Sequence, residues 1–129
     1  ALIRARAFSL GRLMPPFRET NGRKMATRRE KIEAMLADAP DDITLKYMLP
    51  MEFASEGDHE TSVARLAALT KGESPYVPAF FMAAQQLAEL GRVEEARDRL
   101  RMGIDAARAQ GDAHAAAEMS ELLESLGSA

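Results

Sequence analysis

The sequence predicts an all-α protein of about six helices, and three observations carry this prediction. Aromatic residues make up only 5% of the chain and Trp is absent, whereas Ala, Leu, Glu and Arg, which favour helices, are plentiful. Apolar residues recur at helical spacing, and single glycines interrupt the runs, as in LAELGRVEEARDRL at 87–100. With 129 residues, 47% of them hydrophobic, the chain can form one compact domain with a modest core.

Residues 1–24 differ from the rest of the chain in charge and in pattern. They carry six basic residues against one acidic residue, a net charge of +5, whereas residues 25–129 carry 11 basic and 19 acidic residues, a net charge of −8. No helical period survives Gly11, Pro15-Pro16 and Asn21-Gly22. The sequence therefore predicts a basic, disordered leader or upstream extension at 1–24, followed by a helical domain at 25–129.

The first half of this domain shows start and stop signals for two helices. Thr27-Arg28-Arg29-Glu30 has the form of a capping box and predicts a helix over 27–39, which ends before Pro40. Asp42 can cap a second helix over 43–56. Pro50 lies inside that helix and removes the hydrogen bond to the carbonyl of Lys46, so we expect a kink at 46–50 or a helix that starts late.

Four more helices follow from the same kind of signals. Asp58 can cap a third helix that closes near Gly72, and the prolines of KGESPYVP fit the loop and first turn of a fourth helix that ends at Gly91. A fifth helix is predicted over 93–110 and a sixth, after Gly111-Asp112, over 113–126. Each closing glycine can adopt the left-handed conformation that ends a helix.

The pattern repeats with a period of 34 residues. Gly57 and Gly91 are 34 residues apart, and at the same offset five identical pairs coincide: Met48 and Met82, Ala54 and Ala88, Glu60 and Glu94, Arg65 and Arg99, Leu66 and Leu100. Helix pairs of this period resemble the tetratricopeptide repeat (TPR) family, most closely at 77–110, where Gly91, Ala96 and Leu100 match its pattern, and less closely at 43–76. The resemblance covers residues 27–127 and implies an α-α superhelix, a right-handed solenoid fragment, with 27–39 and 112–127 as capping helices.

The first repeat departs from the expected pattern at three positions, one of which is the proline inside its first helix, Pro50. Lys46 stands where the family has an aromatic residue that Phe80 retains in the second repeat, and Ser62 replaces the small alanine that Ala96 retains. The phase of the flanking segments agrees with the repeat, because Ile32, Met35 and Pro40 stand where the second helix of a preceding repeat would lie. Helix 113–126 is similar to a first helix without its second.

The resemblance implies a binding surface on the concave wall, which the first helix of each pair forms. It places on that wall Thr44, Tyr47, Met51, Ala54, Ser55, Pro78, Phe81, Gln85, Ala88, Glu89, His114, Ala117 and Glu121. Tyr47, Met51 and Phe81 are the leading candidates, because aromatic residues and Met are enriched in interface cores. The alternative interpretation is that these three residues belong to the ordinary core.

One comparison with known binding chemistry narrows the kind of partner. Family members that bind acidic chaperone tails use Lys and Asn on this wall, and the matching positions here are Tyr47, Met51, Phe81 and Gln85, so a chaperone co-adaptor role is disfavoured. We expect an apolar or amphipathic segment of a protein or peptide instead.

Catalytic, metal and cofactor sites are not predicted. Cysteine is absent, Asp58-His59-Glu60 is better explained as a helix start, and HETSV at 59–63 lacks the second His of HExxH. No phosphate-binding glycine loop or catalytic triad is found, so we expect no enzyme and no cofactor. The charged run at 94–101 reads as a solvated helix face.

Two functions remain as hypotheses. The leading one is a non-catalytic interaction module that binds a protein or peptide, or a second copy of itself as a homodimer, on the concave face. The alternative is that the basic leader at 1–24 binds nucleic acid or an anionic membrane, with the helical body as a carrier. Nucleic acid is disfavoured, since the leader has only Phe8 and Phe17 as aromatics. No apolar run is long enough to span a membrane and Arg4 and Arg6 disfavour a secretory signal, so we expect a soluble, cytoplasmic protein.

Overall fold

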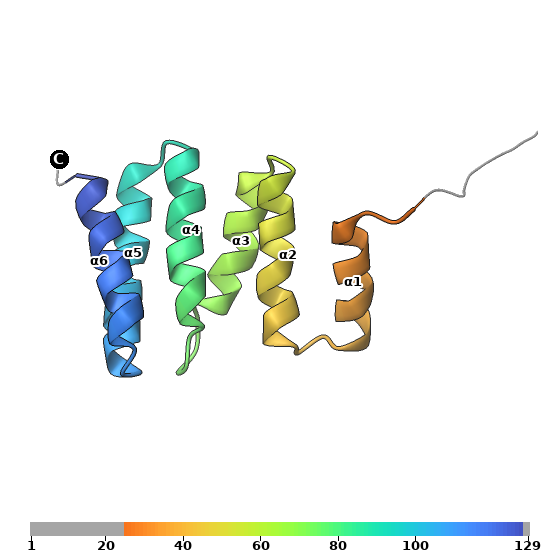
Figure 1. Ribbon diagram of the computed structural model, residues 1–129, viewed down its shortest axis with the longest axis horizontal. Coiled ribbons are helices and arrows are strands. Elements are labelled where there is room, and N and C mark those ends of the chain that lie inside the picture. The colour runs from red at the N-terminus through yellow and green to blue at the C-terminus, as the bar shows by residue number, and fades with distance from the viewer. Residues whose placement is uncertain (1–24, 128–129) are drawn as a thin grey trace, which may run out of the picture. The chain divides into compact units, whose positions relative to one another are not determined.

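The computed structural model describes residues 25–127, which form six helices and no strand. The leader predicted at 1–24 lies outside these described residues. The chain divides into two units, residues 1–31 and 32–129, and each is described by itself below. The all-α prediction with six helices is confirmed (Figure 1).

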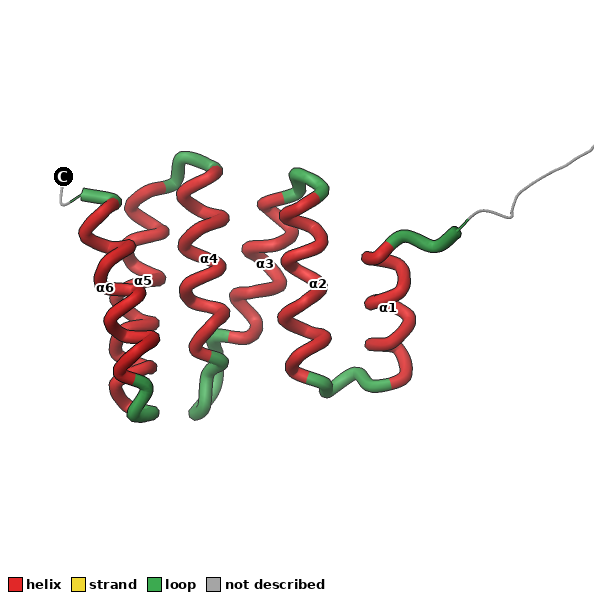
Figure 2. The backbone as a smooth tube through the Cα atoms, in the orientation of Figure 1, coloured by secondary structure: helices red, strands yellow, loops and turns green. Residues whose placement is uncertain are grey.

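The helix bounds follow the predicted start and stop signals closely. The helices are α1 (Arg28–Asp38), α2 (Ile43–Ser55), α3 (His59–Leu69), α4 (Val77–Glu89), α5 (Val93–Ala109) and α6 (Ala113–Ser125). The largest difference is at the end of α3. This helix ends at Leu69, three residues before Gly72, and the connector to α4 follows (Figure 2).

The helix starts use the side chains that the sequence indicates. In the first unit, the backbone N–H of Thr27 donates to Glu30 Oε1 at 2.9 Å and the N–H of Glu30 donates to Thr27 Oγ1 at 3.1 Å, which confirms the capping box. Asp42, Asp58 and Asp112 each accept a bond from the backbone N–H three residues later, at 3.0 to 3.1 Å. These bonds satisfy amide groups that have no partner within the helix.

One turn type joins three of the helix pairs. In the turn at Gly91, φ is +75°, the glycine N–H donates to the carbonyl of Ala88 at 3.0 Å, and the N–H of Arg92 donates to Leu87 at 2.9 Å. The turns at Gly57 and Gly111 repeat this double bond. It is the Schellman arrangement, in which a left-handed residue closes the helix and lets the next one start at once.

Within residues 32–129, each helix from α2 to α6 packs against its neighbours in the chain, and α4 also meets α6 (Figure 1). The arrangement is that of stacked helical hairpins, consistent with a helical repeat. The largest hydrophobic cluster joins α4, α5 and α6 through residues such as Phe80, Leu87, Leu100 and Met119. Two smaller clusters form around Leu49 and around Leu66.

Pro50 is accommodated inside a helix that starts at its expected residue. Because α2 already begins at Ile43, the alternative of a late start is wrong. Pro50 is fully buried, so its ring contributes packing even though it removes one backbone donor. The kink at 46–50 stays a prediction.

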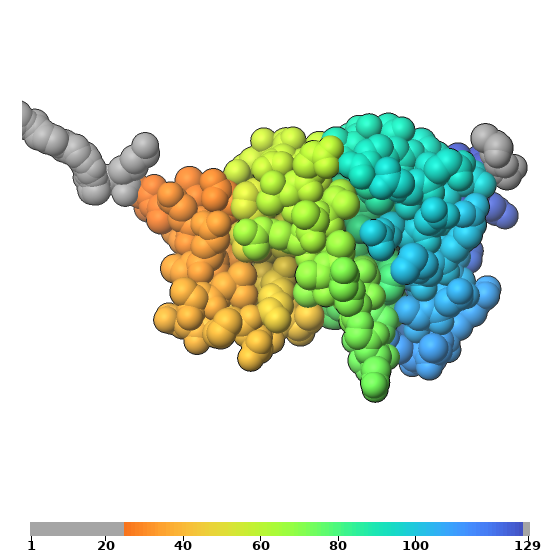
Figure 3. All heavy atoms as spheres, turned by 180° about the vertical axis from the view of Figure 1, so that it is seen from behind, coloured from red at the N-terminus to blue at the C-terminus, as the bar shows by residue number. Residues whose placement is uncertain are grey.

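The connector between α3 and α4, residues 70–76, is the longest link among α2 to α6. It projects beyond the helix ends in Figure 3, where it forms the green protrusion. The N–H of Tyr76 donates to the carbonyl of Leu69 at 2.8 Å, and Gln110 Nε2 donates to the carbonyl of Pro75 at 2.9 Å. These bonds fix the end of the connector where α4 begins.

No helix in the described part of the chain is long and apolar enough to cross a membrane.

Candidate functional site

A groove of about 320 Å³ lies along the first helices of the hairpins. Its lining residues come from α2, α4, the cap of α6 and α6 itself: Tyr47, Val77, Pro78, Phe81, Asp112, His114, Ala115, Glu118 and Met119. The walls are mostly apolar, and the carboxylates and the imidazole come from α6 and its cap. This groove is therefore built from three segments that are distant in the sequence.

Four of the residues predicted for the concave wall line this groove: Tyr47, Pro78, Phe81 and His114. The other nine do not line it, and they are Thr44, Met51, Ala54, Ser55, Gln85, Ala88, Glu89, Ala117 and Glu121. Six of these nine residues are exposed, and Ala54, Gln85 and Ala88 are half-buried. Residues four apart share a helix face, so Met51 lies one turn from Tyr47 and Gln85 one turn from Phe81.

Tyr47 belongs to the groove and to the core at the same time. Its ring meets that of Tyr76 edge to face, with centroids 5.3 Å apart, and it packs against the cluster that contains Ala79 and Ala83. Burial, followed by the neighbouring Tyr76, raises the pKa of Tyr47 above its ordinary value. Its neighbours thus hold the ring in one orientation. A side chain that is already ordered loses little entropy when a ligand binds against it.

Acidic side chains border the apolar part of the groove. Glu118 lies 3.5 Å from His114 Nε2, and both side chains are largely exposed. Asp112 uses one carboxylate oxygen to accept the N–H of Ala115 at 3.0 Å. The sequence reading missed Glu118 and Asp112 as groove residues, although the four-residue spacing from His114 to Glu118 could have indicated the first.

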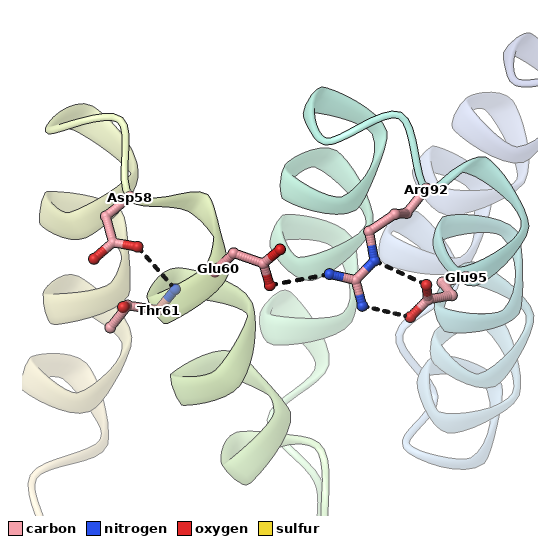
Figure 4. A network of polar contacts seen from close by, with 5 residues as sticks. All are labelled: Asp58, Glu60, Thr61, Arg92 and Glu95. Atoms are coloured by element: carbon pink, nitrogen blue, oxygen red, sulfur yellow. Dashed lines mark hydrogen bonds and ion pairs between the residues drawn. The ribbon is translucent and has the colours of Figure 1, made fainter.

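The acidic stretch Asp58-His59-Glu60 is engaged in structural contacts elsewhere. Asp58 caps α3, His59 Nδ1 contacts Gln86 Oε1, and Glu60 accepts a bond from Arg92 Nη1 at 3.0 Å. Figure 4 shows how Arg92 reaches from the start of α5 to Glu60 on α3. No three potential metal ligands gather anywhere in residues 25–127.

Arg92 also forms a bidentate pair with Glu95, with both N–O distances at 2.8 Å (Figure 4). Donation to Glu95 is the main cause that raises the pKa of Arg92, and the same bonds are the main cause that lowers the pKa of Glu95. This network ties the first hairpin to the second at the surface. It lies apart from the groove, since none of its residues lines it.

Comparison with known proteins gives one structural relative. The chain matches no known family description and no curated protein. It is similar to the solution structure of protein BPP2914 from Bordetella parapertussis, with a TM-score of 0.68 and 26% identity over 79% of this chain and 89% of that one. This likeness supports the all-helical fold.

Proposed function

We propose that this protein is a non-catalytic interaction module of TPR-like hairpins, and that its groove binds a peptide segment carrying an apolar residue next to Lys or Arg. The groove between α2, α4 and α6 is the observation that carries the proposal. Tyr47, Pro78 and Phe81 offer apolar contact, and Glu118 lies at the same opening. An apolar floor with a few placed polar groups is typical of a binding surface for a side chain and its neighbour.

Charge favours a basic segment over an acidic one. Residues 25–129 carry a net charge of −8, and the groove contains the carboxylates of Asp112 and Glu118 without Lys or Arg. Opposite charge speeds encounter and fixes orientation, while the apolar anchor supplies most of the affinity. The preferred ligand is therefore an amphipathic segment with at least one cationic residue.

The test is a selection of peptides from a random display library on the full chain, followed by binding measurements by fluorescence anisotropy. We expect enriched peptides to place an aromatic or aliphatic residue beside Lys or Arg. Glu118→Lys should weaken binding of a selected peptide at least about tenfold, which corresponds to about 1.4 kcal/mol.

Glu124→Lys is the matched control, because it makes the same charge change on the same helix outside the groove lining. Its affinity for the peptide should stay close to that of the parent chain. If both variants bind equally well, or if acidic peptides are enriched, the groove is not the binding surface. Loss in both variants would show a general charge effect and would also contradict the proposed site.

A further inference from the structure

A second groove, of about 520 Å³, lies between α5 and α6. All of its lining residues belong to these two helices and the turn after α6: Arg97, Arg101, Ser120, Leu123, Glu124 and Gly127. It shares no residue with the groove of the proposed function. Its position in the repeat indicates what would fill it.

The α5/α6 groove is the place that a second helix occupies in the preceding hairpin. The caps of α4 and α6 coincide at an offset of 36 residues, Tyr76 with Asp112 and Leu90 with Leu126. At this offset, Ala84 and Leu87, which are buried in the cluster with α5, correspond to Ser120 and Leu123. Ser120 and Leu123 are only half-buried, and both line the open groove.

Arg97 is a buried cation without an adequate acceptor in this groove. Its relative exposure is 7%, and neither Nε nor Nη1 has a hydrogen-bond partner. The carboxylate of Glu94 lies 3.5 Å from Nε and forms a loose ion pair. The expectation that the 94–101 run is uniformly solvated is therefore wrong at Arg97, because this residue adjoins the buried stripe of Ala96 and Leu100. A buried guanidinium gains most from a carboxylate that reaches it directly.

The preceding repeat shows that this position is a stacking contact. Arg97 corresponds to Val63 at the 34-residue offset, and Val63 packs against the large cluster that α4, α5 and α6 build. An equivalent contact for Arg97 requires a further helix beside α5 and α6. The cluster residues that contact Val63 are apolar. To pair with Arg97, the further helix would need a carboxylate at the corresponding position.

The described part of α1 within the second unit, residues 32–38, has the matching surface. Ile32 lies 68 residues before Leu100, so α1 has the phase of a second helix. At the same offset Met35 corresponds to Gly103, which is buried directly against Phe80 of α4 and Met119 of α6. Met35 is 52% exposed, since no first helix among residues 32–127 covers it. This helix also carries acidic residues at 33 and 38.

We propose that α1 of a second copy packs into the α5/α6 groove, so that copies of this chain stack head to tail. Met35 then contacts α6 of the neighbouring copy, and a carboxylate of α1 pairs with Arg97. The two surfaces are different patches of one chain, so the contact is heterologous and a growing stack always leaves one α1 and one groove open. This self-association is separate from peptide binding in the first groove.

The test is sedimentation velocity of the full chain over about 10 μM to about 1 mM, the range in which a weak interface becomes populated. We expect the average mass to rise with concentration beyond twice the 14.1 kDa of one chain. Met35→Lys should block α1 and Ser120→Lys should block the groove, and each variant alone should remain monomeric. Mixed in equal amounts they should form a dimer and nothing larger, because only one productive pair of surfaces remains.

Met102→Lys serves as the control, since Met102 is also an exposed methionine but lies outside both surfaces. It should associate as the parent chain does. Glu124→Lys is a second groove variant in case Ser120→Lys loses its helical circular dichroism. A parent chain that stays monomeric overturns the proposal, as does one that stops at a dimer or a variant mixture that does not pair.

Discussion

The two copies of the 34-residue repeat, 43–76 and 77–110, differ at three matching core positions. The second repeat has Phe80, Ala84 and Ala96, all buried in the large cluster. At the equivalent positions the first repeat has Lys46, which is half-exposed, and Pro50 and Ser62, which are buried but differ in chemistry from Ala84 and Ala96. The comparison teaches that similar backbones can have unequal cores, and it predicts that stability is concentrated in α4, α5 and α6.

Leu66 and Leu100 are the matched pair for the central test. Both are 0% exposed, but Leu100 lies in the large cluster and Leu66 in a smaller one with Ala79 and Ala83. We expect Leu100→Ala to lower the free energy of unfolding by about 4 kcal/mol and Leu66→Ala by about 3 kcal/mol, because a larger rigid cluster collapses less around a cavity. Urea unfolding followed by circular dichroism measures both. The reverse order would break the comparison.

Gly103 tests how tightly α5 packs in the second repeat. A Cβ at this position would lie 2.5 Å from Met119 Sδ and 2.6 Å from Phe80 Cβ. Gly103→Ala should therefore destabilise the fold by about 2–3 kcal/mol, although alanine favours a helix over glycine by about 1 kcal/mol. The thermal midpoint gives the measurement, with the exposed Asp105→Ala on the same helix as a control. A rise in the midpoint for Gly103→Ala would show that the packing is loose.

Pro50 tests whether the first repeat can be improved toward the second, where Ala84 takes its place. Pro50→Ala restores one backbone hydrogen bond and removes a helix penalty of about 3 kcal/mol, but loses two buried methylenes worth about 0.8 kcal/mol each. We expect a net gain of about 1 kcal/mol. Slower amide exchange in α2 should accompany it, and unchanged exchange there would argue against a strained helix at 46–50.

Ser62 and Ala96 can be exchanged in opposite directions. Ser62 is fully buried and its hydroxyl has no hydrogen-bond partner. Ser62→Ala should stabilise the fold by about 1 kcal/mol, and Ala96→Ser should cost about 1–2 kcal/mol, since each change removes or adds an unsatisfied buried group. Chemical unfolding measures the change in unfolding free energy of each variant. Changes of the same sign in the two variants would contradict this prediction.

The surface network at Arg92 should give the smallest effect. The pKa of Glu95 is lowered in the folded state, so its contribution is present above the unfolded glutamate pKa of about 4.3 and is lost as pH falls through the lower folded value. Arg92→Gln should therefore flatten the decline of stability on the acid side. Melting curves at several pH values measure it, and high salt should shrink the difference between variant and parent. If the variant and the parent chain lose stability equally on the acid side at low salt, the network does not contribute to the pH dependence of stability.

Local signals in the sequence predicted most of the fold. The caps at Asp42, Asp58 and Asp112 and the turn at Gly91 depend on a few neighbouring residues, so they can be read directly from the sequence. The burial of Arg97 could not be read in this way, because it depends on how far α6 covers α5. The groove was predicted only in part, since the contribution of Glu118 depends on the relative placement of α4 and α6.

The nearest-neighbour packing of α2 to α6 has a consequence for how the chain folds. Contacting residues are close in sequence, so the contact order is low and little loop-closure entropy opposes the first contacts. We expect rapid folding that nucleates in the α4–α5 hairpin and spreads outward to both ends. Among α2 to α6, the first repeat would then join last and open first, so a protease should cleave within α2 and α3 before it cleaves within α4, α5 or α6.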